Sequence, residues 1–155
     1  MKRSLLAELD HGGEAIRVLP LAASDADVLC AAAGERGYSC AQADLAGCAD
    51  KDTFLSRIAE ALEFPDWFGR NWDAFFDCLT DLSWLPSRGH VLVLINTAEM
   101  RSDAPEAFDT ATSIMQEAAM AWQKRDGSLR VIMDAPPVSP AGSAPQRARR
   151  KRRKT

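Results

Sequence analysis

Three aspartates, Asp73, Asp77 and Asp81, recur at four-residue spacing within the segment WDAFFDCLTDL. Residues four apart in a helix lie on the same face, so this spacing predicts an acidic stripe along one helix. Like charges at this spacing repel by roughly a few tenths of a kcal/mol per pair, and the segment has no lysine or arginine to relieve them. Such a stripe could bind the cationic groups of a partner. The alternative is the solvated face of an ordinary amphipathic helix.

Large aromatic side chains surround the stripe and divide into two groups. Steps of about 100° per residue place Phe76 between the acidic face and the core face. Trp67 and Phe68 precede the helix, where no periodicity directs them inward. These three rings are therefore predicted to be exposed beside the acids. The face expected to pack into the core consists of Trp72, Phe75, Leu79 and Leu82.

The boundaries of this helix are marked by residues with known local preferences. Pro65 should end the preceding helix, because the residue before a proline is disfavoured in helical conformation. Gly69 gives the backbone the freedom that a tight connection often needs. Asn71 is a good N-cap, so the new helix is expected to begin there and to run to about Leu82.

Strands and helices are expected to alternate along the rest of the chain, which predicts an α/β fold with a parallel sheet. The sheet should have three or four strands, with helices on both sides. Residues 1–37 are expected to form an N-terminal extension whose strand could join the sheet, residues 38–135 the main domain, and residues 136–155 a disordered basic tail. The expected strands are 14–22, 38–47, 90–96 and 128–135, and the expected helices are 24–35, 52–63, 71–82 and 103–125.

The charge is distributed unevenly along the 155 residues, which have 19 basic and 22 acidic side chains. Seven of the basic residues lie in the last nine positions, so the preceding chain has a net charge of about −10. An acidic body predicts a basic macromolecular partner. The tail could instead bind nucleic acid weakly and nonspecifically through its phosphates. Its basic residues are Arg147, Arg149, Arg150, Lys151, Arg152, Arg153 and Lys154.

The sequence has few of the groups that metal sites and active sites require. It has two histidines, and its cysteines show no metal-ligand or redox spacing, so they are expected to be buried free thiols in a reducing compartment. No phosphate-binding glycine-rich loop or nucleophile–base arrangement is present. The predictions are therefore a protein that is not an enzyme, without cofactor or metal. With no signal peptide or membrane segment recognised, a cytoplasmic monomer is expected.

The segment FPDWFGRNWDAFFDCLT, Phe64 to Thr80, resembles the signature of the barstar family, the intracellular inhibitors of secreted guanyl-specific ribonucleases of the barnase type. The similarity extends more loosely from about Tyr38 to Met133. It implies a barstar-like fold and an immunity protein that blocks a nuclease active site with an acidic helix and the aromatic loop before it. An adaptor that binds another basic protein through the same face remains the alternative.

The resemblance also implies roles for individual positions. Asp77 would take the place of the RNA phosphate, with supporting contacts from Asp73 and Thr80. Trp67 and Phe68 stand where the family's namesake has paired tyrosines, so they would pack on the nuclease without phenolic hydrogen bonds. Arg70 replaces an acidic residue of the family pattern. The implied partner-binding positions are Trp67, Phe68, Gly69, Asn71, Asp73, Phe76, Asp77 and Thr80.

Overall fold

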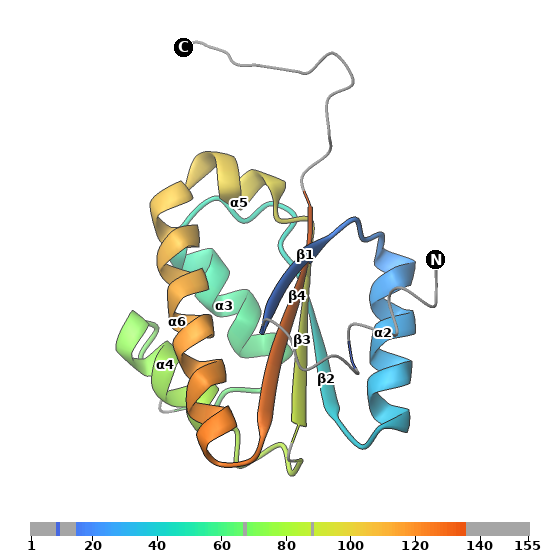
Figure 1. Ribbon diagram of the computed structural model, residues 1–155. Helices are drawn as coiled ribbons and strands as arrows, with labels where there is room; N and C mark the ends of the chain where they lie inside the picture. The colour runs from blue at the N-terminus through green and yellow to red at the C-terminus, as the bar shows by residue number, and fades with distance from the viewer. Residues whose placement is uncertain (1–8, 10–14, 67, 88, 136–155) are drawn as a thin grey trace, which may run out of the picture.

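A computed structural model of the protein describes residues 9, 15–66, 68–87 and 89–135. All four strands pair in parallel, in the order β1-β4-β3-β2 (Figure 1). The predicted α/β fold with a parallel sheet is confirmed, and the sheet has four strands. The first strand along the chain, β1, lies at one edge of the sheet and pairs with the last, β4. The strands are β1 (Ile16–Leu19), β2 (Ser39–Asp44), β3 (Gly89–Ile95) and β4 (Ser128–Asp134).

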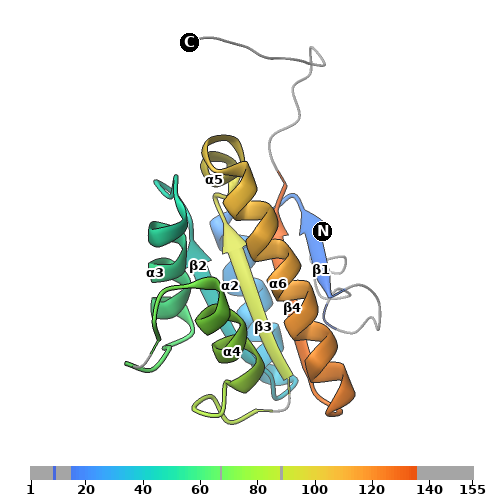
Figure 2. The same ribbon diagram turned by 90° about the vertical axis from the view of Figure 1, so that its left-hand side faces the viewer.

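Helices cover both faces of this sheet, as predicted. Figure 1 shows α2 on one face and the other labelled helices on the opposite face. Figure 2, turned by 90°, shows α4 and α6 side by side in front of β3. The helices are α2 (Ala23–Glu35), α3 (Lys51–Ala61), α4 (Trp72–Asp81), α5 (Ala98–Asp103) and α6 (Pro105–Lys124).

The central strand β3 is buried along its whole length, as its continuous apolar sequence predicts. Successive side chains of a strand point to opposite faces. Val91 and Val93 accordingly belong to the cluster packed beneath α2, whereas Leu92 and Leu94 belong to the larger cluster beneath α3, α4 and α6. The larger cluster is the one on which the acidic helix α4 rests.

The long helix predicted over 103–125 is confirmed as α6, which begins at Pro105, but the short helix α5 before it was not predicted. The structure has two helices there, separated at Ala104, whose φ of −138° and ψ of 60° are not helical. Pro105 explains the break, because its ring disfavours helical geometry at the residue before it and its fixed φ suits the first position of the next helix. The short helix α5 lacks the apolar periodicity that would have predicted it.

The prediction of buried free thiols is wrong for two of the four cysteines. Cys30 and Cys40 form a disulfide, with their Cα atoms 5.2 Å apart, whereas Cys48 and Cys78 are free and buried. The turn between α2 and β2 brings the first pair together, which their sequence spacing alone does not show. Disulfides persist mainly in oxidising compartments, so the pair gives no support to the expected cytoplasmic location, which stays a prediction.

His90 is the buried histidine of β3, at 1% exposure. Its Nδ1 lies 2.5 Å from the hydroxyl of Ser39, its Nε2 has no hydrogen-bond partner among the described residues, and its ring centroid lies 4.8 Å from that of Trp122. Burial lowers the pKa of His90, because the charged imidazolium loses its hydration.

This burial predicts a loss of stability in mild acid. Below its ordinary pKa of 6.5, His90 takes up a proton more readily in the unfolded chain than in the folded one, so the free energy of unfolding should fall as the pH falls. Between pH 7.5 and 5.5 the expected loss is up to about 1.4 kcal/mol. Urea unfolding at both pH values measures it. His90→Gln should remove this part of the pH dependence, and an unchanged dependence in that variant would contradict the assignment.

Candidate functional site

The acidic helix α4 has the start that the sequence predicts. The side chain of Asn71 accepts a hydrogen bond of 2.8 Å from the backbone N–H of Ala74 and so caps the helix. The helix ends at Asp81, and its C-cap residue Leu82 adopts the left-handed conformation with φ of 49°. The cap fixes where α4 leaves the preceding loop, so it sets the angular position of every side chain on the helix.

The apolar face of α4 anchors the helix to the core, again as predicted. Phe75 and Leu79 are fully buried, Leu82 is 1% exposed and Trp72 is half-buried. The Phe75 ring meets the ring of Phe54 edge to face, with centroids 5.9 Å apart. Edge-to-face pairs of this kind add to the stabilisation from burial. The helix is therefore held firmly on the sheet while its other face meets solvent.

The three aspartates of the stripe are exposed on that outer face. The carboxylates of Asp73 and Asp77 have no hydrogen bond or ion pair within the part of the chain that the structure describes, and Asp81 accepts a 3.2 Å bond from the Ser83 backbone N–H. Burial and, to a smaller extent, the charges of Asp77 and Asp81 together raise the pKa of the Cys78 thiol to about 11. The stripe is thus an uncompensated negative surface.

The loop before α4 packs more tightly than the sequence predicts. Phe68 was expected to be exposed, but it is half-buried, with its ring centroid 4.9 Å from that of Phe64. A turn causes this packing, because the Phe68 backbone N–H donates to the carbonyl of Pro65 and folds the loop back. The ring of Trp84 also meets that of Phe64 edge to face, with centroids 6.1 Å apart. Trp67 lies outside the described residues.

The conformational freedom of this loop resides at a different residue from the one predicted. Of these two neighbouring residues, Arg70 has a positive φ, at 54°, and Gly69 does not. A positive φ is uncommon for a side chain other than glycine, asparagine or aspartate. Gly69 matters for a close approach instead, since a Cβ there would lie 3.1 Å from Nδ2 of Asn71. Its lack of a side chain therefore leaves room for the residue that caps α4.

Phe76 and Thr80 lie between the acidic stripe and α6. Both are half-buried, so Phe76 occupies the seam that its sequence position predicts but is not an exposed ring. The hydroxyl of Thr80 donates to the carbonyl of Phe76 at 3.0 Å. This bond holds the Thr80 side chain against its own helix, beside the aspartates.

Helix α6 supports α4 through two contacts that the sequence does not indicate. Nε1 of Trp122 donates a buried hydrogen bond of 2.8 Å to the carbonyl of Leu79. Nη2 of Arg125 donates to the carbonyl of Thr80, and its guanidinium lies over the ring of Trp122, 4.3 Å from the centroid. Carbonyls at the end of a helix lack partners within the helix, so both bonds stabilise the last turn of α4.

Loss of the Asn71 cap should weaken the whole arrangement. Asn71→Ala removes the acceptor for the Ala74 N–H, so the free energy of unfolding is expected to fall by about 1 kcal/mol, as for other N-caps. Urea unfolding measures the loss. Asn71→Asp keeps an acceptor and should retain most of the stability. Equal losses in the two variants would show that the side chain does not act as the cap.

Two other polar regions of the fold have a structural explanation. At the carboxyl ends of the strands, where ligands bind in many open α/β sheets, Asp134 accepts bonds from the backbone N–H groups of Asn96 and Thr97. The Asn96 side chain donates a hydrogen bond of 2.8 Å to the carboxylate of Asp44, and this bond is the main reason why the pKa of Asp44 is lowered. These side chains bind one another and tie the loop after β3 to both neighbouring strands.

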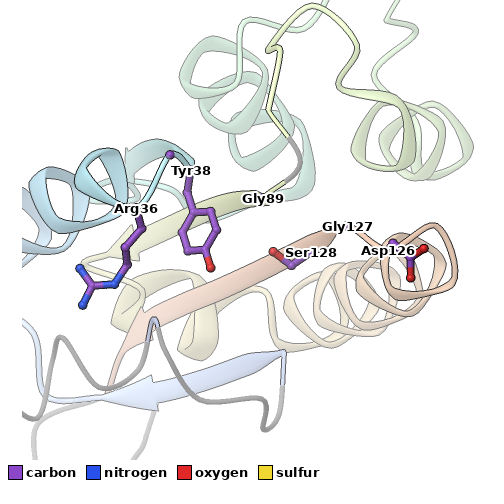
Figure 3. A pocket seen from close by; sticks show the side chains of 7 residues that line it. Arg36, Tyr38, Gly89, Asp126, Gly127 and Ser128 are labelled. Atoms are coloured by element: carbon purple, nitrogen blue, oxygen red, sulfur yellow. The ribbon is translucent and has the colours of Figure 1, made fainter.

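The second region is a pocket of about 370 Å³ at the amino ends of β2, β3 and β4 (Figure 3). Tyr38 lies against Gly89 there, and a Cβ at Gly89 would meet the tyrosine ring at 2.3 Å. Glycine at that position thus makes room for the ring. The remaining lining comes from Arg36, Gly37 and the turn of residues 126–128. Of the predicted partner-binding residues that the structure describes, none lines this pocket.

Comparison with known proteins supports the resemblance noted in the sequence. A family model described as "Barstar (barnase inhibitor)" matches residues 38–134, which include β2, β3, β4 and the acidic helix. The chain belongs to the barstar family. The family match begins just before β2, so it includes three of the four strands observed here.

Among individual relatives of this barstar-family chain is a Bacillus subtilis (strain 168) protein named "Putative ribonuclease inhibitor YrdF". The two are 38% identical over 61 residues, which cover 39% of this chain and 64% of the relative. The matched region thus spans slightly less than two thirds of the relative's length.

Solved structures with the same arrangement of elements have little sequence similarity to this chain. The Aeropyrum pernix ORC2 protein in its ADP form gives a TM-score of 0.61 at 15% identity, covering 86% of this chain and 40% of that one. The structure of Drosophila ORC bound to DNA gives a TM-score of 0.56 at 13% identity, and the match covers 96% of this chain and 40% of that one. At such identity the likeness shows a shared fold alone.

The described residues lack two other features that would indicate a function. No helix among them is long and apolar enough to cross a membrane. Within those same ranges, no group of three or more histidine, cysteine, aspartate or glutamate side chains could hold a metal ion.

Proposed function

We propose that this barstar-family protein is a stoichiometric inhibitor of a basic ribonuclease, which it blocks by placing α4 and the preceding loop over the nuclease active site. The observation that carries the proposal is the pair of carboxylates, Asp73 and Asp77, on a helix that is capped and anchored while both charges lack a partner among the described residues. A surface held in this way is ready for a cationic partner without further ordering.

The chemistry of the target fits this surface. Ribonucleases bind phosphates with arginine, lysine and other hydrogen-bond donors, and a carboxylate can take the place of a phosphate oxygen. Asp77 would make the central contact because it lies in the middle turn of α4, with Asp73 one turn before it and Thr80 beside it. Both carboxylates would replace hydration with charge-assisted bonds on binding.

The remaining proposed positions shape and surround this contact. Trp67, Phe68 and Phe76 would supply packing area that excludes water from the charged pairs, since buried aromatic rings are enriched at the centres of interfaces. Gly69 and Asn71 would hold the loop in the conformation that presents the rings. Phe68 and Phe76 are already half-buried, so they would present ring edges and little of their area would need ordering.

Inhibition titration tests the proposal directly. A panel of barnase-type ribonucleases is assayed on an RNA substrate with increasing amounts of the full chain, and activity of the inhibited enzyme should fall linearly to an end point at one molar equivalent. A version that ends at residue 140 should inhibit equally well if inhibition resides in α4. Absence of inhibition across the panel would contradict the proposal and favour the adaptor alternative.

The truncated version also separates inhibition from direct binding of RNA. The predicted tail contacts involve phosphates, so any RNA binding should weaken steeply with salt and be lost on truncation. Inhibition that disappears together with the tail would indicate competition for RNA instead of occlusion of the nuclease.

A further inference from the structure

An open groove of about 620 Å³ lies between α4 and α6, beside the acidic stripe. Mainly apolar atoms line it, and its most exposed apolar side chain is Met120, at 50% exposure. Within the described residues, Val18 is the other large hydrophobic residue with comparable exposure, at 49%, and it lies on β1 at the far edge of the sheet. The lining residues are Phe76, Thr80, Glu117, Met120, Ala121, Lys124 and Arg125.

The width of this groove is fixed by the bonds between its two helices. Trp122 and Arg125, near the end of α6, donate to the carbonyls of Leu79 and Thr80 near the end of α4. The Thr80 bond uses one of the five N–H donors of the Arg125 guanidinium. The groove is therefore preorganised, and binding in it requires little conformational ordering.

The groove is continuous with the face that we propose covers the nuclease. With about 100° per residue, Phe76 and Thr80 lie on α4 between the core face and the stripe of Asp73 and Asp77. These same two residues line the groove. A partner that covers Asp77 must therefore border the groove along the α6 side.

The charges at the rim differ from those of the stripe. Lys124 and Arg125 lie at one end of the groove, whereas Glu117 lies seven residues earlier on α6, about 10 Å along the helix axis. The cationic end stands beside an otherwise acidic face. A carboxylate of the partner would be favoured there, and a cation would be repelled.

We propose that the α4–α6 groove is a specificity site that accepts an apolar side chain of the inhibited ribonuclease, with an acidic residue of that nuclease against Lys124 and Arg125. The inference rests on the proposed function. The groove adds a requirement for an apolar and an acidic side chain on the nuclease, which the acidic stripe does not impose. A nuclease with only cationic groups at this border could bind the stripe but would not fit the groove. The apolar contact lies beside the charged pairs and would help to exclude water from them.

Inhibition constants for the most tightly inhibited ribonuclease of the panel test the groove. Met120→Ser should raise the constant about tenfold, because it removes an apolar contact from the interface. Val18→Ser, which removes a side chain of equal exposure on β1, should change it less than about twofold. The melting temperature of each variant reports folding, and neither exposed substitution should change it much.

The charge at the rim is tested with a graded pair of variants. Lys124→Gln should weaken inhibition about threefold and Lys124→Glu about tenfold, since the first removes an attraction and the second adds a repulsion. Tighter inhibition by Lys124→Glu would show a cation at that border and overturn the assigned partner chemistry.

The outcomes separate this inference from the function on which it rests. If Met120→Ser behaves like Val18→Ser while Asp77→Ala loses inhibition, the groove is not part of the interface and the acidic face remains. If the unmodified chain inhibits no ribonuclease, both the proposed function and the groove assignment are wrong.

Discussion

Replacement of Asp77 by alanine is expected to raise the inhibition constant by a factor between about 30 and several thousand. The factor corresponds to a loss of about 2–5 kcal/mol of binding free energy. This is the range found when one partner of a buried charge pair is removed, and complexes of barnase with its inhibitor are among those that define the range. The loss is large because the cationic group of the nuclease would stay buried without its counter-charge. Inhibition kinetics at constant salt concentration measures it.

The matched control is Asp52→Ala. Asp52 is exposed in the first turn of α3, outside the proposed face, so its removal should change the inhibition constant less than about twofold. Both variants should remain folded, and Asp77→Ala should relieve some repulsion within the stripe. Equal effects of the two substitutions on inhibition would show that the nuclease does not bind the face of α4.

The second large effect is expected on stability. Phe75→Ala should lower the free energy of unfolding by about 3–5 kcal/mol, because it opens a cavity beneath α4 and removes the edge-to-face contact with Phe54 and the tilted ring contact with Trp72. Phe75 is fully buried and lies 5.9 Å from both Phe54 and Trp72, measured between ring centroids. Urea unfolding monitored by tryptophan fluorescence measures the change.

The adjacent residue provides the comparison. Phe76 is half-buried at the seam, so Phe76→Ala should cost less stability than Phe75→Ala and should weaken inhibition more than its stability loss explains. Measurement of both quantities for both variants separates anchoring from binding. A larger loss of stability in Phe76→Ala would contradict the assigned faces of α4.

The sequence predicted best where local rules and packing agree. Asn71 caps α4, and the apolar positions at helical spacing, Phe75 and Leu79, are buried as expected. The continuous apolar run of β3 likewise forms the central strand. In both elements the local preference and the requirement to bury apolar surface favour the same structure, so a single sequence suffices.

Features that depend on contacts between distant segments were not predicted. The bonds of Trp122 and Arg125 to α4 join residues more than 40 positions apart, and no local pattern marks them. The predicted exposure of Phe68 is wrong for a similar reason, since its burial depends on the turn that brings it onto Phe64. The positive φ of Arg70 belongs to the same turn region and is not a preference of arginine.

Less of the candidate binding site than of the fold could be predicted from the sequence. Periodicity separated the acidic face from the core face of α4, and the structure confirms that separation. The roles of Asp73, Asp77 and Thr80 toward a nuclease come from the family resemblance and remain proposals. Partner contacts are not determined by the folded chain alone, because the same acidic surface could serve more than one cationic partner.

A double-mutant cycle between Asp77 and the nuclease tests the central claim most directly. Asp77→Ala is combined in turn with the substitution to alanine of each arginine, lysine or histidine in the catalytic centre of the inhibited ribonuclease, and the dissociation constants of all four combinations are measured. Occlusion of the active site predicts a coupling energy of at least about 1.5 kcal/mol with one or more of these groups. Additive effects for every pair would contradict active-site occlusion by α4.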